Sequence, residues 1–187
     1  MKLLSTAVLC LSLCTTAAAQ KTKLEMIHEK CPLMNSATNP AAAPPAQPDP
    51  GMMHRGEMGM GFSQTATTHH FLLLPDGGVI QVEANDPSDA DSLASIRMHL
   101  HHIAGAFQQG DFDIPMFVHD TVPPGVPEMK RLLQTLHFSI DESATGGRVS
   151  IRSDNQDAIA AVHKFLIFQI EEHKTGDPIE IPAAPKP

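Results

Sequence analysis

The strongest constraint on the fold is a pattern that occurs twice between residues 68 and 176. Each copy has two short runs rich in apolar and β-branched residues, separated by a glycine-containing turn and followed by a long helical pattern. The runs span residues 68–74 and 79–82 in the first copy, and 135–138 and 148–151 in the second. Such runs and turns predict β-hairpins. Two ββα repeats predict an α+β fold in which a four-stranded antiparallel sheet carries two helices on one face.

Both helical patterns have one apolar stripe and recognisable ends. Each is preceded by a cluster of Asp, Ser or Asn that can cap a helix, and ends in Gly-Asp, at Gly110-Asp111 and Gly176-Asp177. Apolar residues spaced three and four apart predict a helix face directed at the core. These residues are Leu93, Ile96, Leu100, Ile103 and Phe107 in the first helix, and Ile159, Val162, Leu166 and Ile170 in the second.

Strand alternation divides the first hairpin into two faces. If Ile80 and Val82 face the helices, pairing across the turn at residues 75–78 places Phe71, Leu73 and His69 on the same face. The opposite face then carries an apolar patch, which favours a homodimer or a covering segment such as residues 111–130. The residues of this patch are His70, Leu72, Leu74 and Val79.

The first 19 residues have the pattern of a secretory signal peptide, with Lys2, an apolar run over residues 3–13 and small residues up to Ala19. We therefore expect a periplasmic or secreted protein. Lipidation at Cys14 is the alternative. Apart from the signal, the chain has no apolar run long enough to predict a transmembrane segment. After cleavage only Cys31 would remain, so no internal disulfide is expected.

The predicted domain organisation is one domain between flexible ends. Residues 20–60 are rich in Pro, Ala and Met and predict a disordered linker, residues 61–177 a ββαββα domain, and residues 178–187 a disordered tail. The formal net charge is -8, which argues against a nucleic-acid partner.

Histidine and methionine are the candidate metal ligands. His99 and His102 are three residues apart on the first helix and Met98 and His102 four apart, so each pair can meet on the helix surface. Imidazole suits zinc or copper, and a thioether suits copper. Further candidates are His69 and His70 at the start of the first strand, Met116 and His119 after the helix, and Met58 and Met60 before the domain.

The position of this cluster is predicted from the distribution of histidines. The second helix carries only His163 and His173, which assigns a metal site to the first repeat. Whether His69 approaches His99 is left open. The alternative for the histidines is a solvated helix face, and for the N-terminal methionines it is packing on the sheet.

The candidate functions differ in what these residues do. The leading hypothesis is a periplasmic protein that buffers or delivers copper, with zinc second. The alternatives are a non-catalytic interaction module that pairs through its open sheet face and, more weakly, a metal-dependent enzyme. The sequence has no H-E-x-x-H, C-x-x-C-H, G-x-S-x-G or Gly-rich phosphate-loop motif. Clustered imidazoles would also permit pH sensing.

Four segments carry a family resemblance: MGFSQTATTHHF (residues 60–71), IRMHLHHI (residues 96–103), GDFDIPMFVHD (residues 110–120) and PPGVP (residues 123–127). In these segments the chain resembles a family of exported bacterial proteins. The resemblance covers nearly the whole predicted domain but not the leader and linker. The resemblance implies export and supports the domain boundaries, and it assigns no chemistry.

Overall fold

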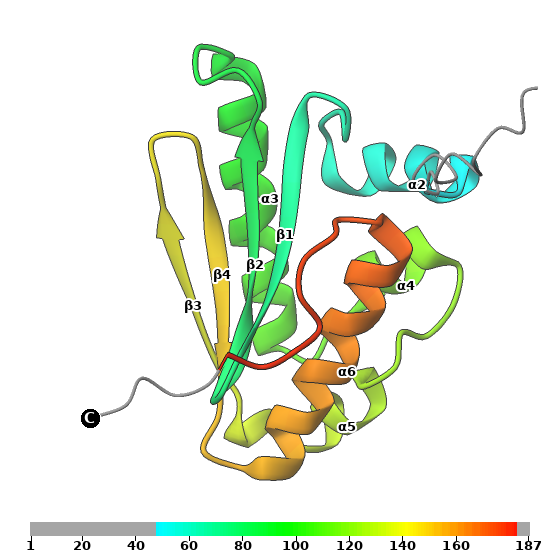
Figure 1. The fold of residues 1–187 in the computed structure, drawn as a ribbon, viewed down its shortest axis with the longest axis vertical. Helices are drawn as coiled ribbons and strands as arrows, with labels where there is room; N and C mark the ends of the chain where they lie inside the picture. Colours follow the sequence, from blue (N-terminus) through cyan, green and yellow to red (C-terminus); the bar gives the residue numbers. More distant parts are fainter. Residues whose placement is uncertain (1–47, 183–187) are drawn as a thin grey trace, which may run out of the picture. The chain divides into compact units, whose positions relative to one another are not determined.

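Four antiparallel strands form an open sheet in the order β1-β2-β4-β3 (Figure 1). The strands are β1 (Thr67–Leu74), β2 (Gly77–Ala84), β3 (His137–Glu142) and β4 (Gly146–Arg152). The computed structural model describes residues 48–182. Each predicted hairpin is present, and β2 pairs with β4 to join them, so β1 and β3 are the edges. The prediction of an α+β fold with a four-stranded antiparallel sheet is confirmed.

The two long helices start at the predicted caps. Helix α3 (Ala90–Gln108) begins after Asp89, which accepts a hydrogen bond from the Ser92 N–H, and α6 (Gln156–His173) begins after Asn155, which accepts from Ala158 N–H. The shorter helices are α2 (Pro50–Met60), α4 (Asp113–His119), α5 (Val126–Arg131) and the single-turn η2 (Leu133–Thr135). None of the helices within residues 48–182 is long and apolar enough to cross a membrane.

Each long helix covers strands of the other hairpin. Helix α3 packs mainly on β3 and β4, whereas α6 packs on β1 and β2. Glycines permit this close approach: a Cβ atom at Gly78 would lie 2.2 Å from the Leu166 side chain, and one at Gly147 would lie 3.0 Å from that of Leu100. Burial of each hairpin's helical face therefore depends mainly on a helix from the other half of the chain.

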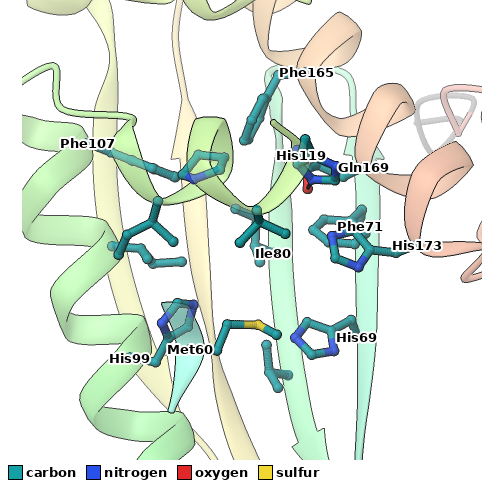
Figure 2. Close-up of a pocket in the computed structure, with 15 residues that line it drawn as sticks. Met60, His69, Phe71, Ile80, His99, Phe107, His119, Phe165, Gln169 and His173 are labelled. Carbon is teal, nitrogen blue, oxygen red and sulfur yellow. Dashed lines mark hydrogen bonds between the residues drawn. The ribbon is translucent and has the colours of Figure 1, made fainter. Parts of the chain in front are cut away.

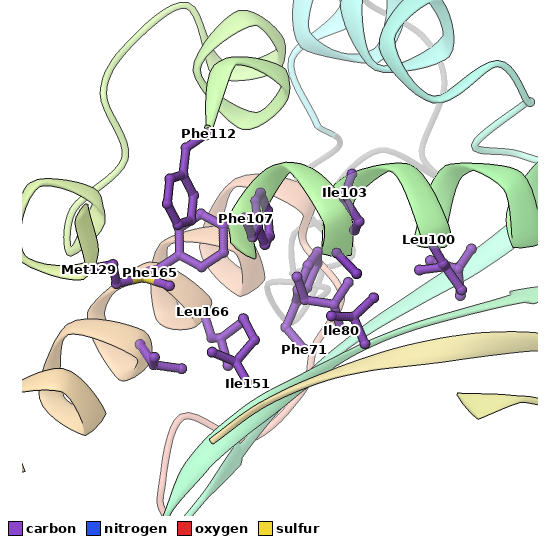
Figure 3. Packing of buried hydrophobic residues seen from close by; sticks show 14 of the residues in the cluster. Phe71, Ile80, Leu100, Ile103, Phe107, Phe112, Met129, Ile151, Phe165 and Leu166 are labelled. Carbon is purple, nitrogen blue, oxygen red and sulfur yellow. The ribbon is translucent and has the colours of Figure 1, made fainter. Parts of the chain in front are cut away.

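The core lies between the sheet and these helices (Figure 3). The register pairs Phe71 with Ile80 and His69 with Val82, so the predicted division of the first hairpin into two faces is confirmed. The predicted helix stripes are buried as well, except that Leu93 is only partly buried. Burying each large apolar side chain contributes about 1.5–3 kcal/mol. This packing fixes which side of β1 faces α6.

Residues 50–60 differ from the predicted linker because they form helix α2. Asp49 caps the helix by accepting from the Met52 N–H, and Pro50 occupies its first turn. Met52 and Met60 are 2% and 8% exposed, and the Arg55 Nε donates to the Val118 carbonyl at 2.9 Å. The linker prediction is wrong for this stretch. Residues 1–47, with the predicted signal peptide and the rest of the linker, and residues 183–187 lie outside the described residues.

Residues 111–130 do not cover the open face of the sheet. They form α4, which packs on α2, and α5, which packs on α6, so both lie on the helical side. Apolar contacts explain the placement: Phe112 is fully buried and stacks on Phe107 with ring centroids 4.5 Å apart, and Met129 is fully buried nearby in the same core. The suggestion that this segment covers the apolar patch is therefore wrong.

Candidate functional site

A cavity of about 60 Å³ lies among β1, β2, α3, α6 and the helices α2 and α4 (Figure 2). Four histidines line it, each from a different element, together with one methionine and one glutamine; the remaining lining is apolar. We call it the histidine pocket. Its polar and sulfur-containing side chains are Met60, His69, His99, His119, Gln169 and His173. A drug-sized ligand needs about 300 Å³ or more, so the pocket suits an ion or a very small molecule.

Secondary structure directs each imidazole into the pocket. His69 shares the helix-facing side of β1 with Phe71, because side chains two residues apart point the same way. His99 lies beside the buried stripe of α3 and is 8% exposed. His119 and His173 are the last residues of α4 and α6, and in each case the next residue adopts a left-handed conformation that ends the helix.

The imidazoles belong to one continuous cluster of rings. Phe62 contacts both His69 and His99, with centroids 5.9 Å and 5.6 Å away. His173 stacks on His69 at 5.9 Å with planes 11° apart, and meets His119 edge-on at 5.1 Å. The approach of His69 to His99, which the sequence left open, therefore occurs across a single phenylalanine ring.

Hydrogen bonding identifies free nitrogen atoms in the pocket. The Nε2 of His119 lies 2.9 Å from the Gln169 amide oxygen, which can only accept, so Nε2 carries the proton and Nδ1 keeps a lone pair. Within residues 48–182 the buried His119 Nδ1, His69 Nε2 and Gln169 Nε2 have no hydrogen-bond partner. Leaving such a group unpaired costs about 1–3 kcal/mol. The pocket therefore contains unused donor and acceptor capacity.

Burial keeps these imidazoles uncharged. Desolvation, reinforced by the neighbouring His70, lowers the pKa of His69 from 6.5 to about 4. Desolvation and the charges of His69 and His102 lower the pKa of His99 to about 4. The pKa of His173 falls to about 3, mainly through desolvation. Desolvation also lowers the pKa of His119. At neutral pH all four rings can therefore offer lone pairs without losing a proton.

The observed ring orientations do not converge on one point. Among the described residues, no group of three or more His, Cys, Asp or Glu side chains is arranged to hold a metal ion. The near-parallel planes of His69 and His173 explain this, because lone pairs in parallel rings point along parallel planes. Rotation about the Cβ–Cγ bond, a broad torsion for imidazole, would be needed to bring the nitrogens together.

The structure brings together some predicted ligands and separates others. Those that line the pocket are His69, His99, His119 and Met60. The others do not: His70 Nδ1 instead lies 2.8 Å from Asp177 Oδ1, and His102 is exposed. Met58 and Met98 are 66% and 67% exposed, and Met116 is half-buried outside the pocket.

His99 and His102, predicted to meet on α3, differ in exposure: His99 lines the pocket and His102 does not. Residues three apart on an α-helix differ in direction by about 60°. His99 lies close enough to the buried stripe to enter the pocket, whereas His102 lies on the solvent side. Met98 is 67% exposed, so it and His102 lie outside the pocket.

Sequence reasoning missed His173 and Gln169, because it assigned a site to the first repeat. The signal was present: Val162, Leu166, Gln169 and His173 follow one another at spacings of three and four, so two polar residues continue the core-facing stripe of α6. Polar residues on such a stripe indicate a buried polar site.

Comparisons with protein-family models, curated proteins and solved structures give no match for the chain.

Proposed function

We propose that the protein binds one copper or zinc ion in the histidine pocket. The observation that carries this proposal is that four uncharged imidazoles from four separate elements line one small cavity, two of them with an unpartnered ring nitrogen. Neutral imidazole is the form that binds zinc and copper. A bound ion would give His69 Nε2 and His119 Nδ1 the partner that residues 48–182 do not supply.

The ring separations are compatible with a shared ion. Two imidazoles on one tetrahedral ion, with metal–nitrogen bonds of about 2.0 Å, have ring centroids roughly 5 Å apart. The centroids of His119 and His173 are 5.1 Å apart, and those of His69 and His173 are 5.9 Å apart. Bringing these rings onto one ion therefore requires ring rotation and only a small displacement of the backbone. This supports His69, His119 and His173 as ligands.

The chemistry of the lining favours holding an ion over turning over a substrate. The lining residues include no carboxylate, hydroxyl or thiol that could act as a base or nucleophile. The cavity of about 60 Å³ also leaves little space beside a metal for a substrate. With the signal-peptide pattern of residues 1–19, these features support buffering or delivery of the metal outside the cytoplasm.

Native mass spectrometry of the metal-free protein with Zn(II), Cu(II) or Cu(I) tests the proposal. All samples carry Cys10→Ser, Cys14→Ser and Cys31→Ser, because free thiols would bind the same ions. We expect one ion per chain, lost in His173→Phe and in His69→Phe. The matched control is the double variant His101→Ala with His102→Ala, which removes two exposed imidazoles from α3 and should retain the ion. Absence of binding by the unaltered pocket would refute the proposal.

We further propose that the two ββα units are repeats of one structural pattern. Gly78 of β2 lies against Leu166 of α6, and Gly147 of β4 lies against Leu100 of α3. The two pairs occupy corresponding positions of the two hairpins and helices. In each unit the glycine follows a second glycine at the start of the inner strand. These matching positions support the repeat. A designed homodimer of one ββα unit, in which each helix covers the hairpin of the other copy, would test it: folding would support the repeat.

A second candidate function is an interaction module. Leu72 and Leu74 are half-buried on the face of β1 that points away from α3 and α6. Val79, on the same face, is 5% exposed, so the exposed part of this apolar patch lies at Leu72 and Leu74. An exposed apolar patch favours association with another protein surface. Sedimentation of Leu72→Asp beside the unaltered protein tests this function: a dimer that dissociates in the variant supports it, and a monomer in both samples contradicts self-association.

A further inference from the structure

Every polar side chain that lines the histidine pocket is uncharged at neutral pH. The pocket offers imidazoles, the Gln169 amide and the Met60 thioether, within an otherwise apolar lining. The charged groups that act on His119 are Glu172 and Arg55, which have opposite signs and opposite effects on its pKa. A cation in the pocket would therefore keep its whole charge in apolar surroundings.

This environment discriminates between ions by their charge. The free energy of moving an ion from water into an apolar medium rises with the square of its charge, so a divalent ion costs about four times as much as a monovalent ion of similar size. An anionic ligand offsets that cost most effectively for Zn(II) and Cu(II), and no carboxylate or thiolate lines the pocket. A monovalent ion needs less compensation, so the neutral lining favours it over a divalent ion.

Met60 adds a soft ligand at a fixed position. It is the last residue of α2, is 8% exposed and lines the pocket. Figure 2 shows its thioether reaching between His99 and His69, the two imidazoles that contact Phe62. Helix α2 is held in place by the hydrogen bonds of Arg55 to Val118 and of Gln64 to the Met53 carbonyl. Thioether sulfur favours Cu(I) among biological cations.

We propose that the histidine pocket selects the monovalent cuprous ion over Zn(II) and Cu(II), with the Met60 thioether as a ligand beside the imidazoles. This inference rests on the proposed metal-binding function and specifies its cargo. The ion binds as Cu(I) and leaves as Cu(I), so no electron is transferred. Helix α2 thus supplies a ligand from outside the segment 61–177 that the sequence defines as the domain.

The chain offers a matched control for Met60. Met58 lies on the same helix two residues earlier, is 66% exposed and does not line the pocket. Replacing methionine by leucine nearly conserves volume and apolar character while removing sulfur. Both replacements remove one sulfur from helix α2, but only Met60→Leu removes it from the pocket.

The experiment measures affinities for Cu(I) and Zn(II) by competition with coloured chelators, without oxygen, on the full chain carrying Cys10→Ser, Cys14→Ser and Cys31→Ser. We expect Cu(I) to bind more tightly than Zn(II) by at least about a hundredfold. Met60→Leu should weaken Cu(I) binding on the order of tenfold to a hundredfold and leave Zn(II) affinity unchanged, and Met58→Leu should alter neither. Copper X-ray absorption of the Cu(I)-loaded protein should show a sulfur neighbour that Met60→Leu removes.

Three results would overturn this inference while leaving metal binding intact. They are Zn(II) affinity equal to that for Cu(I), Cu(I) affinity unchanged in Met60→Leu, and an absorption spectrum without sulfur in the protein that retains Met60. The last does not depend on the variant folding. Failure of both ions to bind would instead refute the proposed function itself, so the two failures are distinguishable.

Discussion

Replacing His69 by Phe should stabilise the protein, and the gain should grow as the pH falls. In the folded chain the pKa of His69 is about 4, mainly because burial disfavours the charged ring, whereas its ordinary value is 6.5. This difference in pKa corresponds to about 3 kcal/mol of folding free energy. A phenylalanine cannot be protonated, so the variant avoids this loss in acid.

The direction follows from which state binds the proton. Above pH 6.5 the ring is neutral in both states and contributes nothing to pH dependence. Between pH 6.5 and about 4 the unfolded chain takes up a proton that the folded chain refuses, so the free energy of unfolding falls as the pH falls. Below pH 4 both states are protonated and the loss levels off. His99 and His173 act in the same direction.

A second contribution does not depend on pH. The Nε2 of His69 is buried without a partner among the described residues, and an unpaired buried nitrogen costs about 1–3 kcal/mol. The phenyl ring of the His69→Phe variant would place carbon where that nitrogen lies, keep the stacking with Phe62 and His173, and extend into the cavity of about 60 Å³. We therefore expect stabilisation of about 1 kcal/mol at pH 7.5, and about 2–3 kcal/mol more at pH 4.5.

Urea unfolding followed by far-ultraviolet circular dichroism measures both values, since the chain has no Trp or Tyr for fluorescence. The matched control is His137→Phe, the same replacement at an exposed position of strand β3. The difference between the two pH values should be larger for His69→Phe than for this control. If His69→Phe changes stability by the same amount at pH 7.5 and pH 4.5, the His69 ring is not held neutral by burial and the reasoning fails.

Three further replacements test the local structure, each by urea unfolding at pH 7.5. Asn155→Ala removes the oxygen that caps α6 and should cost about 1 kcal/mol; no change would show that the cap is supplied by another group. Gly125→Ala should cost at least about 2 kcal/mol, because Gly125 has φ 88° and a Cβ atom there would lie 2.1 Å from the Ala161 carbonyl oxygen. Asp177→Asn should cost about 1–2 kcal/mol by weakening the bonds to His70 and to the Phe71 N–H, and unchanged stability at pH 7.5 would contradict this reasoning.

The parts of the fold that follow from local chemistry could be predicted. The alternation of β1 assigns His69 and Phe71 to the helical face, and the glycine-containing turns set the pairing that keeps them there. Asp89 and Asn155 mark the starts of the long helices because their side chains accept from the first free N–H groups. These features depend on neighbours a few residues away.

The parts that depend on distant contacts could not be predicted. Helix α2 contains three glycines and follows a proline-rich stretch, so its composition favours a linker. It forms because Met52 and Met60 find apolar surface and because Gly59 lies beside Val118 of α4. The pocket is similar in origin, since His173 joins His69 only through the packing of α6 on β1.

The exchange of helices between the two hairpins has a consequence for how the chain assembles. Because α3 packs mainly on β3 and β4 while α6 packs on β1 and β2, neither half of the polypeptide by itself covers most of the helical face of its own strands. Leu100 reaches its glycine partner 47 residues along the chain, and Leu166 reaches back to Gly78, so the native contacts close only once nearly the whole sequence has left the ribosome. Folding should then be slow for a protein of this size, and a fragment released early would expose an unprotected sheet to aggregation.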